Sequence, residues 1–441
     1  MLHAPTAGAD LSAWLAYLER LHPNTIDLGL ERVSAVRARL GLELPFALIT
    51  VGGTNGKGST CALLDSILRS AGYRVGLYTS PHLLRYNERV CIDGHEATDA
   101  ALVAAFERVE AARGGTSLTY FEFGTLAAAL MFRDAALDAA VLEVGLGGRL
   151  DAVNLFDADC AIVTSIALDH MEYLGSTRAA IAHEKAGIFR AGRPAVVAEP
   201  DPPATLLEHA ARVGAPLYLV DRDFGARAGD GQWTFWSWLT RRSALPWPGL
   251  RGACQLGNAA AALAALDCLR ARLPVDMGAV RRGLIEVELA GRFQVLPGRP
   301  LIILDVAHNP HAAQRLSENL DAMPAPDGRI EADSRGRRQP RSFAVFAMLK
   351  DKDIAGVASA LGGRIAHWLV APLPGERGAS AEQVRSALGQ AGVSAPVEMH
   401  PDVAAAFATA QELAGPDDRI VVFGSFHTVG AVLAWLKRPQ R

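Results

Sequence analysis

The segment Thr50-Val51-Gly52-Gly53-Thr54-Asn55-Gly56-Lys57-Gly58-Ser59-Thr60 carries the strongest structural signal in the chain. It follows the apolar run 46–51, which predicts a β-strand, and it opens a helical pattern over 57–70. Glycines let several backbone N–H groups face one anion, and a helix N-terminus adds partial positive charge. Lys57 could reach terminal phosphates, and Ser59 or Thr60 could place a hydroxyl near a metal ion. The segment therefore predicts a phosphate-binding loop.

This loop departs from the common GxxxxGK[ST] pattern at two points. Val51 stands where the first glycine would be, and Gly58 separates Lys57 from Ser59. One alternative is a glycine-rich turn without a ligand, and another is a dinucleotide-binding turn, which has no need of Lys57. The order of strand, loop, lysine, hydroxyl and helix favours nucleotide phosphate.

The overall composition indicates a globular enzyme or binding protein. The chain has 441 residues, of which 50% are apolar and 21% charged, and this length suggests two or three domains. A net charge of −3 gives no reason to expect nucleic acid or a membrane as partner. The five cysteines are scattered and form no CxxC pair, which is typical of reduced thiols in a cytosol. We therefore expect a cytoplasmic protein, and nothing in the sequence demands an oligomer, so we expect a monomer.

Short β-rich runs alternate with helical stretches, which predicts an α/β protein with mostly parallel sheets. A boundary near residue 290 would separate a domain over 1–290 from a smaller one over 291–441. We expect strands over 74–79, 139–144, 160–166, 194–198, 301–305, 343–349, 365–370 and 420–423, a hairpin strand over 232–238, and helices over 99–112, 121–135, 255–272 and from 311 onward. The polar stretch 324–341 predicts a solvated loop.

Polar groups follow two of these strands. Glu143 ends the run 139–143, and Asp169 and His170 come shortly after the strand at 160. The carboxyl ends of parallel strands meet at one edge of a sheet, so both groups should lie beside the phosphate loop. Glu143 suits magnesium, whereas histidine is an unusual ligand for it. From the residues alone, Lys185 has no assigned role, and 305–310 could be a site or a tight turn.

Ten strings then identify a family resemblance. They are TIDLGLERV (25–33), GGTNGKGST (52–60), YTSPHLLRYNERV (78–90), LTYFEFGTL (118–126), LEVGLGGRLDAVN (142–154), TSIALDH (164–170), EKAGIF (184–189), GRFQV (291–295), DVAHNPH (305–311) and GSFHTV (424–429). In this order they resemble the bacterial folylpolyglutamate synthase/dihydrofolate synthase family, the folate branch of the Mur ligase superfamily. The resemblance extends over essentially the whole chain.

The resemblance implies a P-loop ATPase and folate-binding domain over 1–290, followed by a Rossmann-like glutamate-binding domain over 291–441. For ATP it implies Gly53, Thr54, Asn55, Gly56, Lys57, Gly58, Ser59, Asn258, Arg292 and Asp305. For two magnesium ions it implies Ser80, Glu143, His170 and Lys185, the last as a carbamate. Lys57, Glu143, His170 and Lys185 would be catalytic. For the pterin it implies Leu28, Gly29, Thr119, Phe121, Asp151 and Ala152, and for glutamate His308 and Ser425. The segment 374–378 replaces a more usual Pro-Arg pair, so no role is carried over to Arg377.

The implied reaction is ATP-dependent ligation of L-glutamate to dihydropteroate, giving dihydrofolate, and to reduced folates, giving polyglutamates, through an acyl phosphate. Three alternatives stay open. The chain could be a folylpolyglutamate synthase only, a cell-wall ligase acting on a UDP-linked sugar, or a nucleotide-binding switch without ligase activity. The SPHL and LTYFEFG segments favour folate, and the joint occurrence of Glu143, His170 and Lys185 argues against a mere switch.

Overall fold

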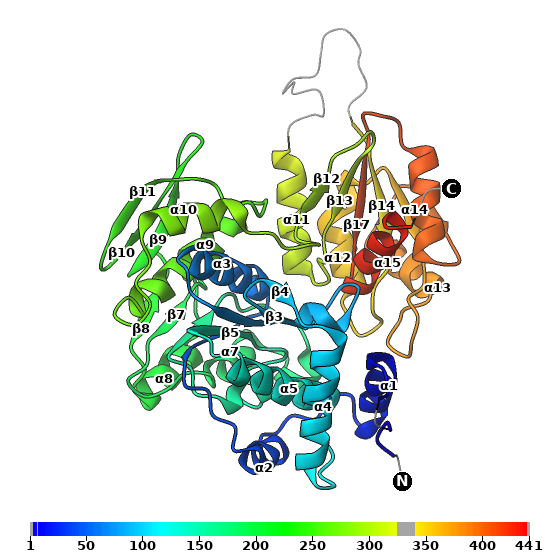
Figure 1. Ribbon diagram of the computed structural model, residues 1–441. Helices are drawn as coiled ribbons and strands as arrows, with labels where there is room; N and C mark the ends of the chain where they lie inside the picture. The colour runs from blue at the N-terminus through cyan, green and yellow to red at the C-terminus, as the bar shows by residue number, and fades with distance from the viewer. Residues whose placement is uncertain (1–2, 7, 324–339, 439–441) are drawn as a thin grey trace. The chain divides into compact units, whose positions relative to one another are not determined.

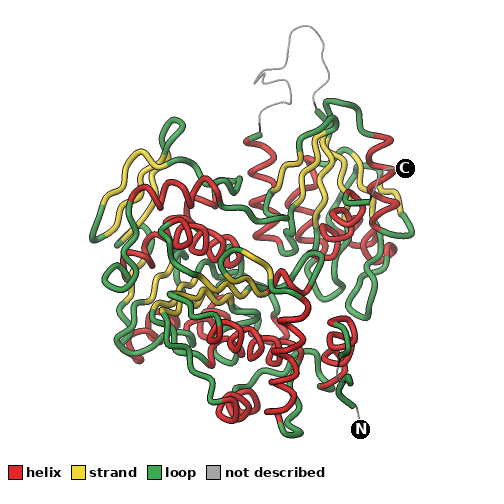
Figure 2. Tube along the Cα trace, in the orientation of Figure 1, coloured by secondary structure: helices red, strands yellow, loops and turns green. Residues whose placement is uncertain are grey.

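The computed structural model describes residues 3–6, 8–323 and 340–438, so the predicted loop over 324–341 lies almost wholly outside the described residues. The chain divides into two compact units (Figures 1 and 2). The first unit contains Met1–Gly249 and Gln255–Val287, and the second contains Leu250–Cys254 and Glu288–Arg441. The main division therefore falls just before the boundary expected at 290, and the second unit also includes a short segment that the sequence did not indicate.

The first unit is built on an eight-stranded sheet with the order β4-β3-β2-β5-β1-β6-β7-β8. Its strands are β1 (Ala47–Gly52), β2 (Val75–Tyr78), β3 (Val90–Ile92), β4 (His95–Glu96), β5 (Ala139–Glu143), β6 (Cys160–Val163), β7 (Ala195–Val197) and β8 (Leu217–Leu219). The six neighbouring strands β2, β5, β1, β6, β7 and β8 are parallel. Strands β3 and β4 are antiparallel additions beside β2 at one edge. Every residue of β1 and β5 is buried, as expected for parallel strands covered on both faces.

Helices cover both faces of this sheet (Figure 1). Three lie on one face: α3 (Lys57–Ser70), α9 (Cys254–Cys268) and α10 (Met277–Glu286). On the other face lie α5 (Tyr120–Asp134), α7 (Arg178–Ala186) and α8 (Ala204–Val213). Three further helices, α1 (Leu11–Leu21), α2 (Glu31–Leu40) and α4 (Asp99–Arg113), pack beside α5 or each other. The helix expected over 57–70 is confirmed at both ends, and its side chains Leu63, Leu64 and Ile67 are fully buried.

A three-stranded antiparallel sheet, β11-β10-β9, forms a separate layer of the first unit. Its strands are β9 (Phe224–Ala228), β10 (Trp233–Ser237) and β11 (Arg241–Leu245). The hairpin strand expected over 232–238 is thus the central strand β10. Trp233 is buried and its indole Nε1 donates to the Pro246 carbonyl at 2.8 Å, which supports a packing role for this residue.

The second unit has a six-stranded sheet with the order β12-β13-β17-β14-β15-β16. Its strands are β12 (Gln294–Leu296), β13 (Leu301–Leu304), β14 (Ser342–Phe346), β15 (His367–Val370), β16 (Val397–Met399) and β17 (Arg419–Phe423). Only β12 runs antiparallel. Its helices are α11 (Pro310–Ala322), α12 (Ile354–Leu361), α13 (Ala381–Gln390), α14 (Val403–Leu413) and α15 (Phe426–Leu436). This is the second α/β series that the sequence predicts.

Three elements end at least three residues earlier than expected, and one of them is the strand expected over 343–349, which ends at Phe346. The strand expected over 160–166 stops at Val163, because the hydroxyls of Thr164 and Ser165 turn to donate to the Asn55 carbonyl, at 2.7 and 3.0 Å. The helix expected to reach residue 272 ends at Cys268, and Arg272 instead donates to Asp159 at 2.7 Å. In the part of the chain that the structure describes, no helix is long and apolar enough to cross a membrane.

Candidate active site

The phosphate loop joins β1 to α3 and contains two glycines with positive φ. Gly53 has φ +144° and Gly56, which caps α3, has φ +88°. A Cβ on Gly53 would lie 1.9 Å from the Thr164 Oγ1, so only glycine fits there. The segment after β6 also holds the loop in place, because the Thr54 N–H donates to the Ser165 carbonyl at 2.7 Å. The residues that follow β6 therefore shape the loop.

Lys57 lies at the first position of α3 and folds back over this loop. Its Nζ donates to the carbonyls of Gly53 and Thr54, at 3.1 and 3.3 Å. Ser59 and Thr60 are buried in the same helical turn. The ammonium group and the helix N-terminus thus place positive charge at one point, as an anionic ligand requires.

The strand register sets Glu143 beside the loop. Val51 of β1 pairs with Glu143 of β5, and Gly52 pairs with Val163 of β6. The Ser80 N–H, in the loop after β2, donates to the Glu143 Oε2 at 3.0 Å. The structure therefore brings Ser80 and Glu143 together at the edge of the sheet that carries the phosphate loop.

His170 belongs to the same edge. The loop after β6 contacts the phosphate loop, because the Thr54 hydroxyl donates to the Ala167 carbonyl at 3.2 Å. His170 then caps the short helix α6 (Met171–Leu174), where its φ is +50°, an uncommon conformation for a residue with a side chain. Its imidazole lies 3.9 Å from the Asp169 carboxylate.

Lys185 is buried inside the first unit, although the sequence alone suggested only a lysine on a helix face. It lies on α7 and is 3% exposed. Burial, and secondarily the charge of Lys57, lower the pKa of its ammonium to about 7, against weaker opposing effects of Asp169 and Asp151. A buried lysine near another cation has a large neutral fraction at neutral pH, so its amine is available for chemistry.

The metal ligands expected here are mostly of unusual type. Among the described residues no three His, Cys, Asp or Glu side chains gather as an ordinary metal cluster. The implied set instead combines one carboxylate, one imidazole, one hydroxyl and one modified lysine. The backbone N–H of Ser80 fixes the buried Glu143 carboxylate, which fits a cation that prefers oxygen ligands.

The predicted pterin region is assembled from segments far apart in the sequence. Thr119 caps α5 in a reciprocal pair, in which its N–H donates to Glu122 at 2.8 Å and the Glu122 N–H donates back at 3.2 Å. Arg32 links Glu122, at 3.1 Å, to Asp27, at 2.9 Å. Asp27 immediately precedes Leu28 and Gly29, so this ion-pair chain connects the two predicted pterin segments.

Phe121 and Asp151, two further residues of the predicted pterin region, contact the backbone that follows β5. A Cβ on Gly145 would lie 2.7 Å from the Phe121 ring, so the ring rests against the backbone just beyond Glu143. Asp151, which precedes the buried Ala152, accepts the N–H groups of Leu146 and Val153 at 2.8 and 2.9 Å. Burial raises the pKa of this carboxyl group to about 6.

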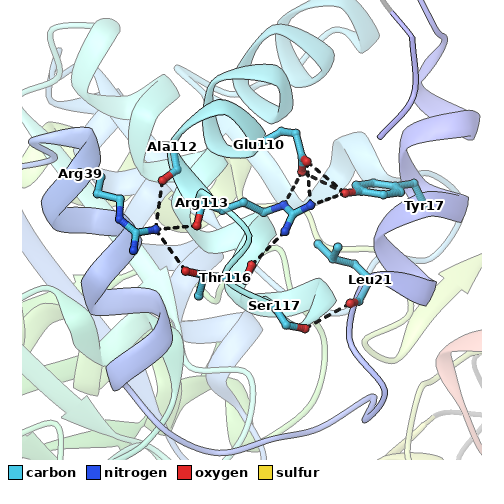
Figure 3. Close-up of polar contacts among 8 residues, drawn as sticks. All are labelled: Tyr17, Leu21, Arg39, Glu110, Ala112, Arg113, Thr116 and Ser117. Atoms are coloured by element: carbon cyan, nitrogen blue, oxygen red, sulfur yellow. Dashed lines mark hydrogen bonds and ion pairs between the residues drawn. The ribbon is translucent and has the colours of Figure 1, made fainter. Parts of the chain in front are cut away.

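A polar network supports the segment that leads into Thr119 (Figure 3). The Arg113 guanidinium donates to Glu110 at 2.6 Å and to the Tyr17 hydroxyl at 2.8 Å. Arg39 donates to the Thr116 hydroxyl at 3.1 Å, and Ser117 donates to the Leu21 carbonyl at 3.2 Å. Helices α1, α2 and α4 therefore hold residues 113–117 in place directly before the predicted pterin segment.

Asn258, expected on the adenine side, also approaches the loop within the first unit. A Cβ on Gly56 would lie 2.6 Å from its Oδ1, and its Nδ2 donates to Gln255 at 2.9 Å. Gly56 is thus required both for its positive φ and for this close approach.

The second unit groups the remaining predicted residues at the carboxyl ends of β13 and β17. Asp305 accepts the N–H groups of Phe293 and Ala307 at 2.9 and 2.8 Å, and burial raises its pKa. The Arg292 guanidinium lies 4.9 Å from the centre of the Phe426 ring, and the His308 ring lies 6.2 Å from it. Ser425 caps α15, where its hydroxyl accepts the Thr428 N–H at 3.0 Å.

Sequence reasoning missed Phe426, although it lies within the GSFHTV string next to Ser425. Arg377, for which no role was expected, pairs with Asp351 at 2.7 Å.

Comparison with known proteins defines the class. The Mur ligase middle domain matches residues 51–266, and the Mur ligase glutamate ligase domain matches residues 291–426. The chain is thus an ATP-dependent ligase of the Mur type. A dihydrofolate synthase/folylpolyglutamate synthase of Escherichia coli (strain K12) is 47% identical over 97% of this chain and 96% of its own length. One from Haemophilus influenzae is 42% identical over 96% and 97%.

Solved structures agree over the full chain. E. coli FolC in complex with DHPP and ADP has a TM-score of 0.90 and 47% identity, covering 98% of this chain and 99% of that one. A bifunctional folylpolyglutamate synthase/dihydrofolate synthase with Mn, AMPPNP and L-glutamate bound has a TM-score of 0.88 and 47% identity, covering 99% and 100%. The chain belongs to the dihydrofolate synthase/folylpolyglutamate synthase family.

Proposed function

We propose that this chain joins L-glutamate to dihydropteroate and to reduced folates, with ATP as the source of an acyl phosphate. The proposal is supported by the phosphate loop with Lys57, by the pairing of Val51 in β1 with Glu143 in β5, and by the buried Lys185, whose pKa the charge of Lys57 helps to lower. The ligands named for related structures, ADP with DHPP and AMPPNP with L-glutamate, support it. These relatives also favour folate acceptors over a UDP-linked sugar.

The chemistry explains why this edge is cationic. A carboxylate is a poor acylating agent, because oxide would have to leave. Transfer of the ATP γ-phosphoryl group to a carboxylate oxygen makes phosphate the leaving group, and the glutamate amine then attacks the carbonyl carbon to form the amide. ATP and the carboxylate repel each other, and Lys57 with the loop N–H groups offsets that repulsion. No protein nucleophile is needed, so positioning is the main task of the site.

A divalent cation would be held by Ser80, Glu143, His170 and carbamylated Lys185. When bound, it would neutralise phosphate charge and stabilise the charge that develops during transfer. The buried Glu143 carboxylate, already oriented by the Ser80 N–H, supports this assignment. Two ions, as the family resemblance implies, would share this donor set.

The environment of Lys185 supports its modification. With a pKa near 7, a large share of its side chain is the neutral amine. The amine nitrogen attacks the carbon of carbon dioxide, a proton leaves the nitrogen, and the product is a carbamate anion. The change replaces a cation beside Lys57 with an oxygen-bearing anion, which removes a like-charge repulsion and supplies ligands for a metal ion.

The remaining substrates are assigned by region. The pterin would lie against Leu28, Gly29, Thr119, Phe121, Asp151 and Ala152. In the second unit, Arg292 and Asp305 would bind the nucleotide, and His308 and Ser425 the incoming glutamate. Asn258 would lie on the adenine side in the first unit. The clustering of Arg292, His308 and Ser425 around Phe426 and the start of α15 supports one anion-binding region for the second unit.

The test is mass analysis of products from ATP, magnesium and glutamate, with dihydropteroate and tetrahydrofolate offered separately. Dihydrofolate from the first and a diglutamate from the second are expected. Product from tetrahydrofolate alone would reduce the activity to folylpolyglutamate synthase, and no amide from either acceptor would refute the proposal. Mass analysis of the intact protein in bicarbonate buffer tests the Lys185 carbamate.

A further inference from the structure

Arg89 occupies an unusual environment in the first unit. Its guanidinium carbon lies 5.4 Å from the centre of the Tyr86 ring and 5.5 Å from that of Tyr120. Its Nε donates to the His82 Nδ1 at 2.8 Å. Two aromatic rings and one hydrogen bond, made by Nε, therefore hold the guanidinium in a set orientation.

No counter-charge for Arg89 is found within the described ranges 3–6, 8–323 and 340–438. Several other arginines of the first unit in or near the predicted site segments pair with carboxylates: Arg32 with Glu122, Arg85 with Glu96, Arg149 with Glu184 and Arg178 with Glu199. Among the described residues, none places a carboxylate within ion-pair distance of Arg89. The adjacent Glu88 is occupied by the backbone N–H groups of Leu83, Leu84 and Arg85, at 2.7–2.8 Å. Arg89 is thus an oriented cation with no carboxylate partner in the part of the chain that the structure describes.

Arg89 lies between the two halves of the proposed acceptor site. Its partner His82 belongs to the loop of Ser80, whose N–H is bonded to Glu143. Its other partner, Tyr120, lies between Thr119 and Phe121 in the predicted pterin segment. The Thr79 N–H also donates to the Arg89 carbonyl at 3.0 Å, which ties the residue to the strand end before Ser80. An acceptor that reaches from the pterin region toward Glu143 would pass this guanidinium.

The two proposed acceptors differ in charge at this position. Dihydropteroate has a single carboxylate, and this group is the one that is phosphorylated and then converted to the amide. A reduced folate already carries a glutamyl residue, so it has a reacting γ-carboxylate and a second, non-reacting α-carboxylate. That second anion must lie within a few ångströms of the first, beside the phosphates, where an unpaired charge is costly. A fixed guanidinium binds a carboxylate through two parallel N–H groups.

We infer that Arg89 is the receptor for the non-reacting α-carboxylate of a folate acceptor, and so decides how well the enzyme uses folates relative to dihydropteroate. This inference rests on the proposed function and deepens it. The two tyrosine rings and His82 hold Arg89 in place before the acceptor arrives, so little side-chain freedom is lost on binding.

The test is steady-state ADP release with Arg89→Gln, Arg89→Lys and the matched control Arg85→Gln, for each acceptor. Arg85 is exposed and pairs with Glu96 on the surface, so its variant should match wild type. Loss of a charge-assisted hydrogen-bond pair should raise the KM for tetrahydrofolate about 10- to 100-fold in Arg89→Gln. The KM for dihydropteroate should stay within about 2-fold of its wild-type value, because this acceptor lacks the second carboxylate. Arg89→Lys keeps the charge without the paired N–H groups, so its KM for tetrahydrofolate should lie between those of wild type and Arg89→Gln. If Arg89→Gln does not fold, the KM values of Arg89→Lys for the two acceptors test the inference.

The second arm uses tetrahydrofolate whose α-carboxylate is converted to the neutral amide. For the wild-type enzyme, the KM for this amide should exceed the KM for tetrahydrofolate by about the factor by which Arg89→Gln raises the KM for tetrahydrofolate. For the Arg89→Gln enzyme, the KM values for the acid and the amide should be equal. Equal losses for both acceptors, or an Arg89→Gln enzyme that still distinguishes acid from amide, would overturn the inference. If wild type made amide from neither acceptor, the proposed function itself would fail, which is a separate and recognisable outcome.

Discussion

Replacing Gly53 with alanine would add a methyl group where the phosphate loop passes closest to the residues after β6. The new Cβ would lie 1.9 Å from the Thr164 Oγ1 and 3.0 Å from the Thr164 nitrogen. Real contacts of this kind do not occur, so the loop or Thr164 must move. Thr164 cannot move freely, because its hydroxyl donates to the Asn55 and Gly52 carbonyls at 2.7 and 3.2 Å.

Two costs add in this variant. An alanine with φ near +144° costs about 1–3 kcal/mol of backbone strain, and overpacking a buried contact costs about 1–3 kcal/mol more. We expect the free energy of unfolding to fall by about 2–6 kcal/mol. Displacement of the loop N–H groups should also weaken ADP binding about 100-fold, as ångström-scale misplacement does at catalytic sites.

Urea unfolding and calorimetric ADP titration measure both effects, and two further variants separate the costs. Gly72 has φ +89° with no atom within 4 Å of an added Cβ, so Gly72→Ala carries strain alone, about 1–2 kcal/mol, and should keep its ADP affinity. Thr164→Ala removes the colliding oxygen. The double variant Gly53→Ala/Thr164→Ala should therefore be more stable, by about 1–2 kcal/mol in the free energy of unfolding, than the sum of the two single effects predicts. If Gly53→Ala behaved like Gly72→Ala in both measurements, the packing of the loop against Thr164 would not be what forms it.

Three further predictions concern other parts of the site. Lys57→Ala should lower glutamate-dependent ADP release about 100-fold or more, because the one ammonium on the loop is lost; unchanged turnover would remove the loop from the mechanism. In buffer free of carbon dioxide, Lys185 should make stability rise with pH between about 7 and 10.5, since its folded pKa lies below its unfolded value of 10.5 and the unfolded chain holds the extra proton there. Lys185→Met should remove that slope in urea titrations, and an identical slope would contradict the burial of the amine. Arg113→Ala should lower stability by about 2 kcal/mol, because partly buried hydrogen bonds to Glu110 and Tyr17 are lost. It should also raise the KM for dihydropteroate, and an unchanged KM would show that this network does not position Thr119.

Some elements of this fold depend on neighbouring residues, and others depend on contacts between residues far apart in the sequence. The β1–loop–α3 segment was predictable because strand, turn and helix depend on neighbouring residues: apolar β-formers, then glycines, then a helical pattern. The same local rules predicted most strands of both units. They misjudged the end of β6, because Thr164 and Ser165 leave the sheet to bond the Asn55 carbonyl, a partner far away in the chain.

The sequence by itself therefore determined the fold class, the phosphate loop and, through its family strings, the residues to examine. Only the tertiary structure decided that Lys185 is buried near Lys57 and that the Ser80 N–H orients Glu143. It also decided that Arg89 packs against the rings of Tyr86 and Tyr120 without a carboxylate partner among the described residues. The strand order β2-β5-β1-β6 creates these contacts by bringing distant loops to one edge. Burial and charge pairing depend on that three-dimensional neighbourhood, and no local pattern of residues encodes it.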